Sequence, residues 1–157
     1  MRTIPDAFAA AVAHHQAGRL PEAEQIYRQI LQVAPEHADT LHLLGVIASQ
    51  VGQHQAAIEY IGRAIQLNGN QPAFHCNLGK VNRALGRNVD AIACYRRALE
   101  LNPDHAEARN NLGNALNDQG ELGEAMACLR RAVELKPDYA EAHNNLGLTY
   151  HQQGKLE

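Results

Sequence analysis

The chain has 157 residues and a formal net charge of −3, with an apolar content of 45% and a charged content of 20%. This composition is typical of a folded domain, excludes an intrinsically disordered chain, and makes nucleic acid or an anionic membrane surface an unfavourable partner. Trp is absent and aromatic residues make up only 4%, so a chain rich in Ala is expected to form helices instead of sheets.

The sequence repeats with a period of 34 residues. Asn102–Gly113 (NPDHAEARNNLG) and Lys136–Gly147 (KPDYAEAHNNLG) agree at nine of twelve aligned positions. One glycine recurs at this interval along the whole chain, at Gly18, Gly52, Gly86, Gly120 and Gly154. The same interval separates four Leu-Gly pairs, which are Leu44-Gly45, Leu78-Gly79, Leu112-Gly113 and Leu146-Gly147, and four alanines, which are Ala23, Ala57, Ala91 and Ala125. A fixed period of this length indicates a repeat architecture.

A 34-residue period with Leu-Gly in its first half, Ala in its second half and Pro at its close resembles the tetratricopeptide repeat, a helix-turn-helix unit. The resemblance covers nearly the whole chain. It implies an all-α, right-handed superhelical solenoid with a concave groove lined by the first helix of each unit. In chain order, full units are expected at residues 4–37, 38–71, 72–105 and 106–139, and residues 140–157 supply the first helix of a truncated fifth. Together they are expected to form one solenoid domain.

Each unit carries signals for its helix ends. The glycine of the Leu-Gly pair lets the two helices of a unit approach closely, and Gly18 and its equivalents are expected to end the first helix with a positive φ angle. The second unit departs from the pattern, because Gly69 replaces the closing proline and Gly62 lies inside a helix, where it costs about 1 kcal/mol. In the later units, Asp104 and Asp138 are expected to open helices as capping boxes.

The sixth position of the later units is an asparagine, and the family pattern implies that this position faces the groove. These residues are Asn77, Asn111 and Asn145. A carboxamide can donate to a peptide C=O and accept from a peptide N–H at once, so this asparagine ladder would hold the backbone of an extended ligand. Neighbouring units lie about 10 Å apart, and an extended chain rises about 3.3 Å per residue. Each asparagine of the ladder, which we call a rung, would therefore meet about every third residue of the bound ligand. Alternatively, these asparagines stabilise turns or are simply solvated.

Further polar residues on the same expected helices complete the predicted groove: Asn110, Asn144, Asn114, Asn117, Lys80 and Arg83. They are expected to make contacts that flank the ladder. Lys80, Arg83 and Asn111 also allow a second binding mode of the family, a clamp for a C-terminal carboxylate. Acidic residues at the second position of the units, such as Glu107 and Glu141, would repel a carboxylate, so this mode is disfavoured.

No catalytic residue, metal site or cofactor is expected in this chain. The nine His residues include no HExxH motif and no pair with metal-ligand spacing on one helix, which predicts no metal site. Cys94 and Cys128 are one repeat apart, too far for a disulfide, and Cys76 lacks an evident base to activate it. No apolar run approaches the roughly 18 residues of a membrane span and no secretory signal is present, which predicts a cytoplasmic protein.

The favoured hypothesis is a protein–protein interaction module that binds an extended peptide or protein segment in the concave groove. The segments NNLGNAL and AIACYRRALELNPDHAEA resemble the repeat region of O-linked N-acetylglucosamine transferases, whose asparagine ladder holds acceptor proteins. This resemblance implies an alternative, in which the chain is the acceptor-recruiting part of a larger glycosyltransferase with its catalytic domain beyond Glu157. A third hypothesis is end-to-end self-association, because Ala142, Leu146 and Tyr150 would lack a second helix to cover them.

Overall fold

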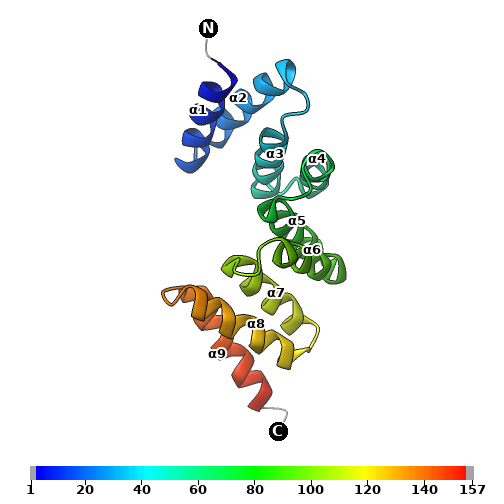
Figure 1. Ribbon diagram of the computed structural model, residues 1–157, viewed down its shortest axis with the longest axis vertical. Helices are drawn as coiled ribbons and strands as arrows, with labels where there is room; N and C mark the ends of the chain where they lie inside the picture. Colours follow the sequence, from blue (N-terminus) through cyan, green and yellow to red (C-terminus); the bar gives the residue numbers. More distant parts are fainter. Residues whose placement is uncertain (1–2, 155–157) are drawn as a thin grey trace. The chain divides into compact units, whose positions relative to one another are not determined.

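The computed structural model describes residues 3–154, and over this range it contains nine α-helices and no β-strand. Successive helices pair as antiparallel hairpins (Figure 1). The helices are α1 Ile4–Gln16, α2 Leu20–Val33, α3 Ala38–Gln50, α4 His54–Leu67, α5 Pro72–Ala84, α6 Asn88–Leu101, α7 Ala106–Asp118, α8 Leu122–Leu135 and α9 Ala140–Gly154. The all-α repeat fold predicted from the period is confirmed.

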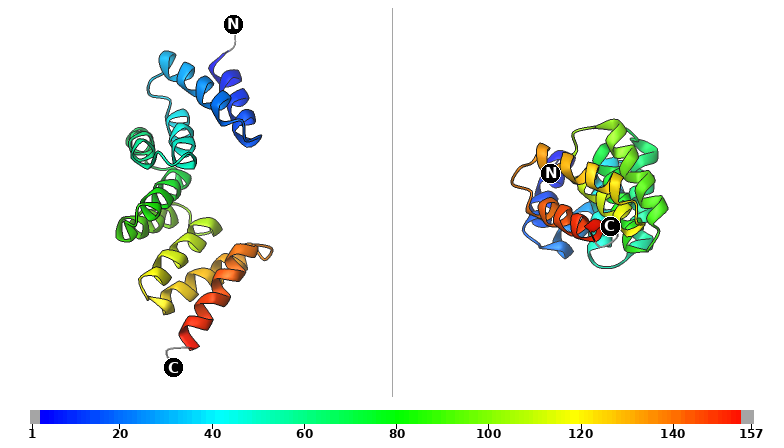
Figure 2. Two further views of the ribbon diagram at one scale, coloured as in Figure 1. Left: turned by 180° about the vertical axis from the view of Figure 1, so that it is seen from behind. Right: turned by 90° about the horizontal axis from the view of Figure 1, so that it is seen from below.

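The chain divides into two compact units, Met1–Asn70 with α1 to α4 and Gln71–Glu157 with α5 to α9. We call them the N-terminal unit and the C-terminal unit. In the N-terminal unit, each helix packs against the next one from α1 to α4, and the same holds from α5 to α9 in the C-terminal unit. Figure 2 shows this succession from behind. The first helices α3, α5, α7 and α9 begin 34 residues apart, at Ala38, Pro72, Ala106 and Ala140.

A glycine with a positive φ angle lies in the turn inside each complete hairpin. These angles are 74° at Gly18, 80° at Gly52, 72° at Gly86 and 79° at Gly120. At the first turn, the N–H of Gly18 donates to the carbonyl of His15 at 3.0 Å, which closes the end of α1. Because glycine alone reaches this backbone conformation cheaply, the predicted role of these four residues is confirmed.

The glycines of three Leu-Gly pairs, Gly45, Gly79 and Gly113, lie where the first helix of a hairpin touches the second. A Cβ atom at Gly45 would lie 2.6 Å from Cγ1 of Ile61, and a Cβ atom at Gly113 would lie 2.6 Å from Cγ of Leu129. The recurring alanines of the second helices have no exposed surface; they are Ala23, Ala57, Ala91 and Ala125. Small residues on both helices therefore allow the close packing that the sequence predicts.

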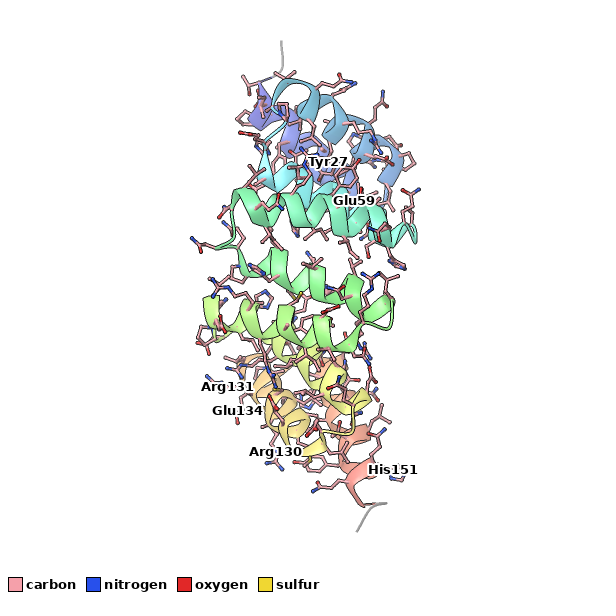
Figure 3. The ribbon with its side chains drawn as sticks, turned by 90° about the vertical axis from the view of Figure 1, so that its right-hand side faces the viewer. Tyr27, Glu59, Arg130, Arg131, Glu134 and His151 are labelled. Carbon is pink, nitrogen blue, oxygen red and sulfur yellow. The ribbon has the colours of Figure 1, made fainter. Side chains whose placement is uncertain are left out.

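Each unit has its own apolar core. In the N-terminal unit, Tyr27 of α2, labelled in Figure 3, is completely buried and belongs to a cluster with Ile30 and Ile47. In the C-terminal unit, Tyr95 of α6 lies in a cluster with Leu116 of α7. The core of the C-terminal unit thus continues from one hairpin to the next and holds its first helices in fixed positions.

Histidines cap α3 and α7. Nδ1 of His37 and Nδ1 of His105 each accept a hydrogen bond from the backbone N–H three residues later, at 3.2 Å. The capping box predicted at Asp104 is therefore wrong, because α7 begins one residue later than that box requires. Asp104 instead accepts a hydrogen bond from Arg131 at 3.1 Å. Asp138 likewise lies two residues before Ala140, the first residue of α9.

The face of α9 predicted to lack a covering helix is less apolar than expected. Ala142 has no exposed surface, because α9 packs against α8. The hydroxyl of Tyr150 accepts a hydrogen bond from Nε of Arg130 at 2.7 Å, and the guanidinium lies 5.3 Å from the centre of the tyrosine ring. Leu148 and Tyr150 stay exposed, at 53% and 43%. Self-association through this face stays a prediction.

A substitution at Gly62 tests whether this glycine, which departs from the repeat pattern inside the second repeat, destabilises its helix. It lies inside α4, and no neighbouring atom comes within 4 Å of the place its Cβ would take. Gly62→Ala is expected to raise the free energy of unfolding by about 0.5–1 kcal/mol, because Ala loses less backbone entropy in a helix. Urea denaturation measures this change. Gly52→Ala, at a positive φ angle, is the control and should lower the same quantity; equal effects of both variants would contradict this account.

Candidate functional site

All nine residues predicted to line the groove lie in the C-terminal unit, on the first helices of successive hairpins. Helix α5 carries Asn77, Lys80 and Arg83, α7 carries Asn110, Asn111, Asn114 and Asn117, and α9 carries Asn144 and Asn145. Helix α7 contacts both α5 and α9, so the three helices form one row (Figure 1). The fold therefore brings the predicted residues onto neighbouring helices of a single compact unit.

The three ladder asparagines are all half-buried. Nδ2 of Asn111 donates to Sγ of Cys76 at 3.7 Å, and Nδ2 of Asn145 donates to Oδ1 of Asn110 at 2.9 Å. Each of these two rungs thus uses one N–H to bond the preceding repeat. A carboxamide has two N–H donors and a carbonyl oxygen, so Asn111 and Asn145 each have an oxygen and a second N–H that these two bonds do not use.

Asn110 has a different role from the one predicted. Its side chain has no exposed surface. Its Nδ2 donates to Oε1 of Glu141 at 3.0 Å and to the hydroxyl of Tyr139 at 3.4 Å, and its Oδ1 accepts from Asn145. This burial excludes the ligand contact predicted for Asn110. Buried amides are stable only when their polar atoms are paired, and here the pairs with Glu141 and Asn145 join α7 to α9, the helix of the fifth repeat.

A pocket of about 290 Å³ lies among α5, α6 and α7. It is lined by Lys80, Arg83, Ala84, Tyr95, Asn111 and Asp118. Three of the predicted groove residues, which are Asn111, Lys80 and Arg83, therefore line the same pocket. Asp118 was not among the predicted residues.

Both cations of this pocket are neutralised by acids of the following repeat. Lys80 forms an ion pair with Glu107. The guanidinium of Arg83 donates from Nε and from Nη2 to Oδ2 of Asp118, at 3.0 Å and 2.9 Å. The pocket is therefore close to electrically neutral, and a carboxylate ligand would have to compete with Glu107 and Asp118 for the cations.

Several contacts between first helices share one sequence offset, 35 residues, which is one period plus one. The offset joins Asn111 to Cys76, Asn145 to Asn110 and Arg83 to Asp118 in the C-terminal unit, and His15 to Gln50 at 3.0 Å in the N-terminal unit. Complementary polar residues do stand at this spacing in the sequence, but the offset itself is known only from the structure, because it depends on how neighbouring first helices are displaced.

The thiol beside the pocket is unreactive. Cys76 is 2% exposed, and burial, followed by the nearby Glu107 carboxylate, raises the pKa of its thiol to about 11. Such a thiol is almost wholly protonated at neutral pH, and only the thiolate is a nucleophile. Burial also raises the pKa of Cys94 and of Cys128. All three cysteines are free thiols.

The remaining predicted residues differ in accessibility. Asn144 is exposed on α9, whereas Asn114 and Asn117 are half-buried on α7. Oδ1 of Asn117 is buried and accepts no hydrogen bond from the residues that the structure describes. This atom is an acceptor that a ligand donor or a water molecule could satisfy.

Arginines of the second helices do not form an open basic patch. Arg96 donates to Glu124 of the next hairpin at 3.0 Å, and Arg131 bonds Glu134 on its own helix at 3.1 Å. Figure 3 shows Arg131 and Glu134 close together on α8. Exposed pairs of this kind stabilise little, but they compensate the positive charge.

Neither a metal centre nor a membrane span is found in the part of the chain that the structure describes. Residues 3–154 contain no group of three or more His, Cys, Asp or Glu side chains able to hold a metal ion. Over the same range, no helix has both the length and the hydropathy needed to cross a bilayer.

Family comparisons match almost the whole chain to one kind of repeat. A model described as TPR repeat matches residues 79–117 and 113–154, and two models described as tetratricopeptide repeat match residues 6–68 and 42–95. The comparison with curated proteins found no match.

Solved structures give the same result. A crystal structure of MamA is 26% identical, covers 92% of this chain and 84% of its own, and has a TM-score of 0.80. The O-GlcNAc transferase of Thermobaculum terrenum is 27% identical over 85% of this chain, which spans only 27% of the transferase, at a TM-score of 0.80. YrrB, a TPR protein with an unusual peptide-binding site, is 24% identical over 97% of this chain and 78% of its own, at a TM-score of 0.76. With its 34-residue period, its helical hairpins and these matches, the chain belongs to the tetratricopeptide repeat family.

Proposed function

We propose that the C-terminal unit binds an extended polypeptide segment along α5, α7 and α9, with Asn77, Asn111 and Asn145 holding its backbone. The observation that carries this proposal is the position of three half-buried carboxamides at equivalent places on neighbouring helices of one row. Asn is a poor residue for a helix interior, so its recurrence there favours a role in binding. The peptide-binding site of YrrB supports a peptide as the class of ligand.

The charges around the rungs support recognition of neutral backbone over recognition of a charged chain end. Lys80 and Arg83 already pair with Glu107 and Asp118. A ligand carboxylate would have to displace one of these acids and leave it without its cation, whereas a peptide group can bond a carboxamide with no such exchange. Because peptide groups are common to all sequences, the expected recognition is tolerant of ligand sequence.

The test compares the wild-type chain with the triple variant Asn77→Ala, Asn111→Ala and Asn145→Ala. Peptides are first selected from a displayed random library on the immobilised wild-type chain, and their affinities are then measured by calorimetry. Each lost hydrogen bond contributes about 0.5–1.5 kcal/mol, so the triple variant is expected to bind at least about tenfold more weakly.

The matched control removes three exposed carboxamides from second helices of the N-terminal unit, through Gln25→Ala, Gln32→Ala and Gln66→Ala. These residues are exposed and lie outside the proposed groove. Circular dichroism should show unchanged helicity in both triple variants. Equal peptide affinity of the wild-type chain and the asparagine variant would reject the ladder.

A second candidate function is acceptor recruitment for a larger glycosyltransferase. It is favoured by the similarity to the O-GlcNAc transferase, of whose length this chain covers 27%. On this proposal the chain itself carries no catalytic group, and the transferase domain follows it. The gene sequence after Glu157 decides the matter: a sugar-nucleotide-binding α/β region supports recruitment, and a stop codon rejects it.

A further inference from the structure

A short chain of hydrogen bonds connects an exposed carboxylate with one rung of the ladder through the interior. Glu141 at the start of α9 accepts from Nδ2 of Asn110 at 3.0 Å, and Oδ1 of Asn110 accepts from Nδ2 of Asn145 at 2.9 Å. Asn110, in the middle, has no exposed surface. Asn145 is half-buried, so this series of hydrogen bonds ends at the candidate groove.

The charge of Glu141 determines which group donates and which accepts in each of these hydrogen bonds. The oxygen and nitrogen of a carboxamide have nearly the same size, so shape alone does not decide which way Asn110 points. An ionised carboxylate only accepts hydrogen bonds, so Asn110 must turn its NH₂ group toward Glu141. Its second N–H donates to the hydroxyl of Tyr139 at 3.4 Å. Its Oδ1 is then left for Asn145, which must present its own Nδ2 in return.

The third repeat provides an internal comparison. There, Cys76 occupies the position of Asn110, and Asn111 donates to its Sγ at 3.7 Å. Sulfur is a weak acceptor, and a thiol can also donate. The bond at Asn111 is therefore longer and does not impose a direction on the carboxamide, in contrast to the bond at Asn145.

We infer that Asn110 is a positioning residue, which together with Glu141 holds the Asn145 carboxamide in one orientation. One N–H of Asn145 is bound inward, and its Oδ1 and second N–H are held ready for the C=O and N–H of a polypeptide backbone. A group held in its binding orientation loses less conformational entropy when the ligand arrives. The orientation of Asn145 is independent of any ligand, whereas its use for backbone binding rests on the proposed function.

The orientation is tested without a ligand, by NMR of the whole 157-residue chain. Hydrogen exchange of the side-chain amide of Asn145 is compared with that of Asn144, its exposed neighbour on α9. In the wild-type chain, Asn145 is expected to exchange at least about fivefold more slowly. Glu141→Gln keeps the size of the side chain but can donate as well as accept, so it should remove this protection while leaving the backbone amides of α9 unchanged.

Asn110→Cys introduces the residue that the third repeat already has at this position, and it should have the same effect on Asn145. Equal exchange of Asn145 and Asn144 in the wild-type chain would overturn the inference. So would unchanged protection of Asn145 in Glu141→Gln.

A binding measurement separates this inference from the proposed function. With peptides selected on the wild-type chain, Asn110→Cys is expected to weaken binding about tenfold, and to have no further effect when Asn145→Ala is already present. Additive losses would overturn the positioning role. If no peptide binds the wild-type chain while Asn145 is protected, the proposed function fails and the orientation of the rung stands.

Discussion

Gly113→Ala is expected to lower the free energy of unfolding by about 1–3 kcal/mol through overpacking. The added Cβ would lie 2.6 Å from Cγ of Leu129 and 3.2 Å from the carbonyl oxygen of Ala125. A new rotamer of Leu129 would relieve the first contact but not the second, because the second involves backbone. The better helix propensity of Ala recovers only about 0.5–1 kcal/mol, so the net effect remains destabilising. Urea denaturation followed by circular dichroism measures it.

Gly147→Ala is the matched control, because Gly147 has the same place in its repeat but no neighbouring atom within 4 Å of its Cβ position. This variant should be neutral or stabilising. Leu129→Ala, at a residue with no exposed surface, is expected to cost about 2–5 kcal/mol alone, and it should reduce the additional cost of Gly113→Ala. A loss in Gly147→Ala as large as that in Gly113→Ala would contradict the explanation by close helix approach.

Alkaline conditions are expected to destabilise the fold through Cys76. Burial raises the pKa of this thiol from 9.0 to about 11, with a further contribution from Glu107. Below pH 9 the thiol is protonated in both the folded and the unfolded chain, so its contribution to stability is fully present. Between pH 9 and pH 11 the unfolded chain loses the proton first, and stability falls by about 1.4 kcal/mol per pH unit. Over this range the loss from Cys76 alone amounts to about 2–3 kcal/mol.

The comparison variant for this pH dependence is Cys76→Ala, which has no titrating thiol. Tyr27, whose pKa burial raises to about 12, titrates in the same way in both chains. Denaturation midpoints measured from pH 8 to pH 11 should therefore fall more steeply in the wild-type chain. Parallel curves for the two chains would show that the Cys76 thiol does not set this loss.

Local and periodic features of the fold were predictable from the sequence because they depend on single positions. A glycine that ends a helix with a positive φ angle, as Gly18 does, can be recognised from its residue type and its spacing in the sequence. The glycine opposite Leu129 and the buried alanine at Ala125 recur once per repeat for the same packing reason. The prediction of a capping box at Asp104 was wrong because His105 and Asp104 are adjacent and both able to cap, and only the start of the helix distinguishes them.

The sequence predicted which helix positions carry the residues of the candidate groove, but not which side chains these residues bond. The family pattern placed the asparagines on first helices, yet whether a carboxamide faces solvent or a neighbouring repeat depends on how far two helices approach each other. Asn110 and Asn144 illustrate the difference, since one has no exposed surface and the other is exposed, although they are one period apart and occupy the same position in successive repeats.

By itself the sequence determined the repeat, its helical hairpins and the row of helices that carries the asparagines, because these follow from a period and from the intrinsic properties of Gly, Ala and Pro. Only the tertiary structure decided that Asp118 neutralises Arg83 and that Asn110 supports Asn145. The physical reason is that hydrogen bonds and ion pairs act over about 3 Å, so they depend on the displacement between neighbouring helices, which residue type and spacing do not specify.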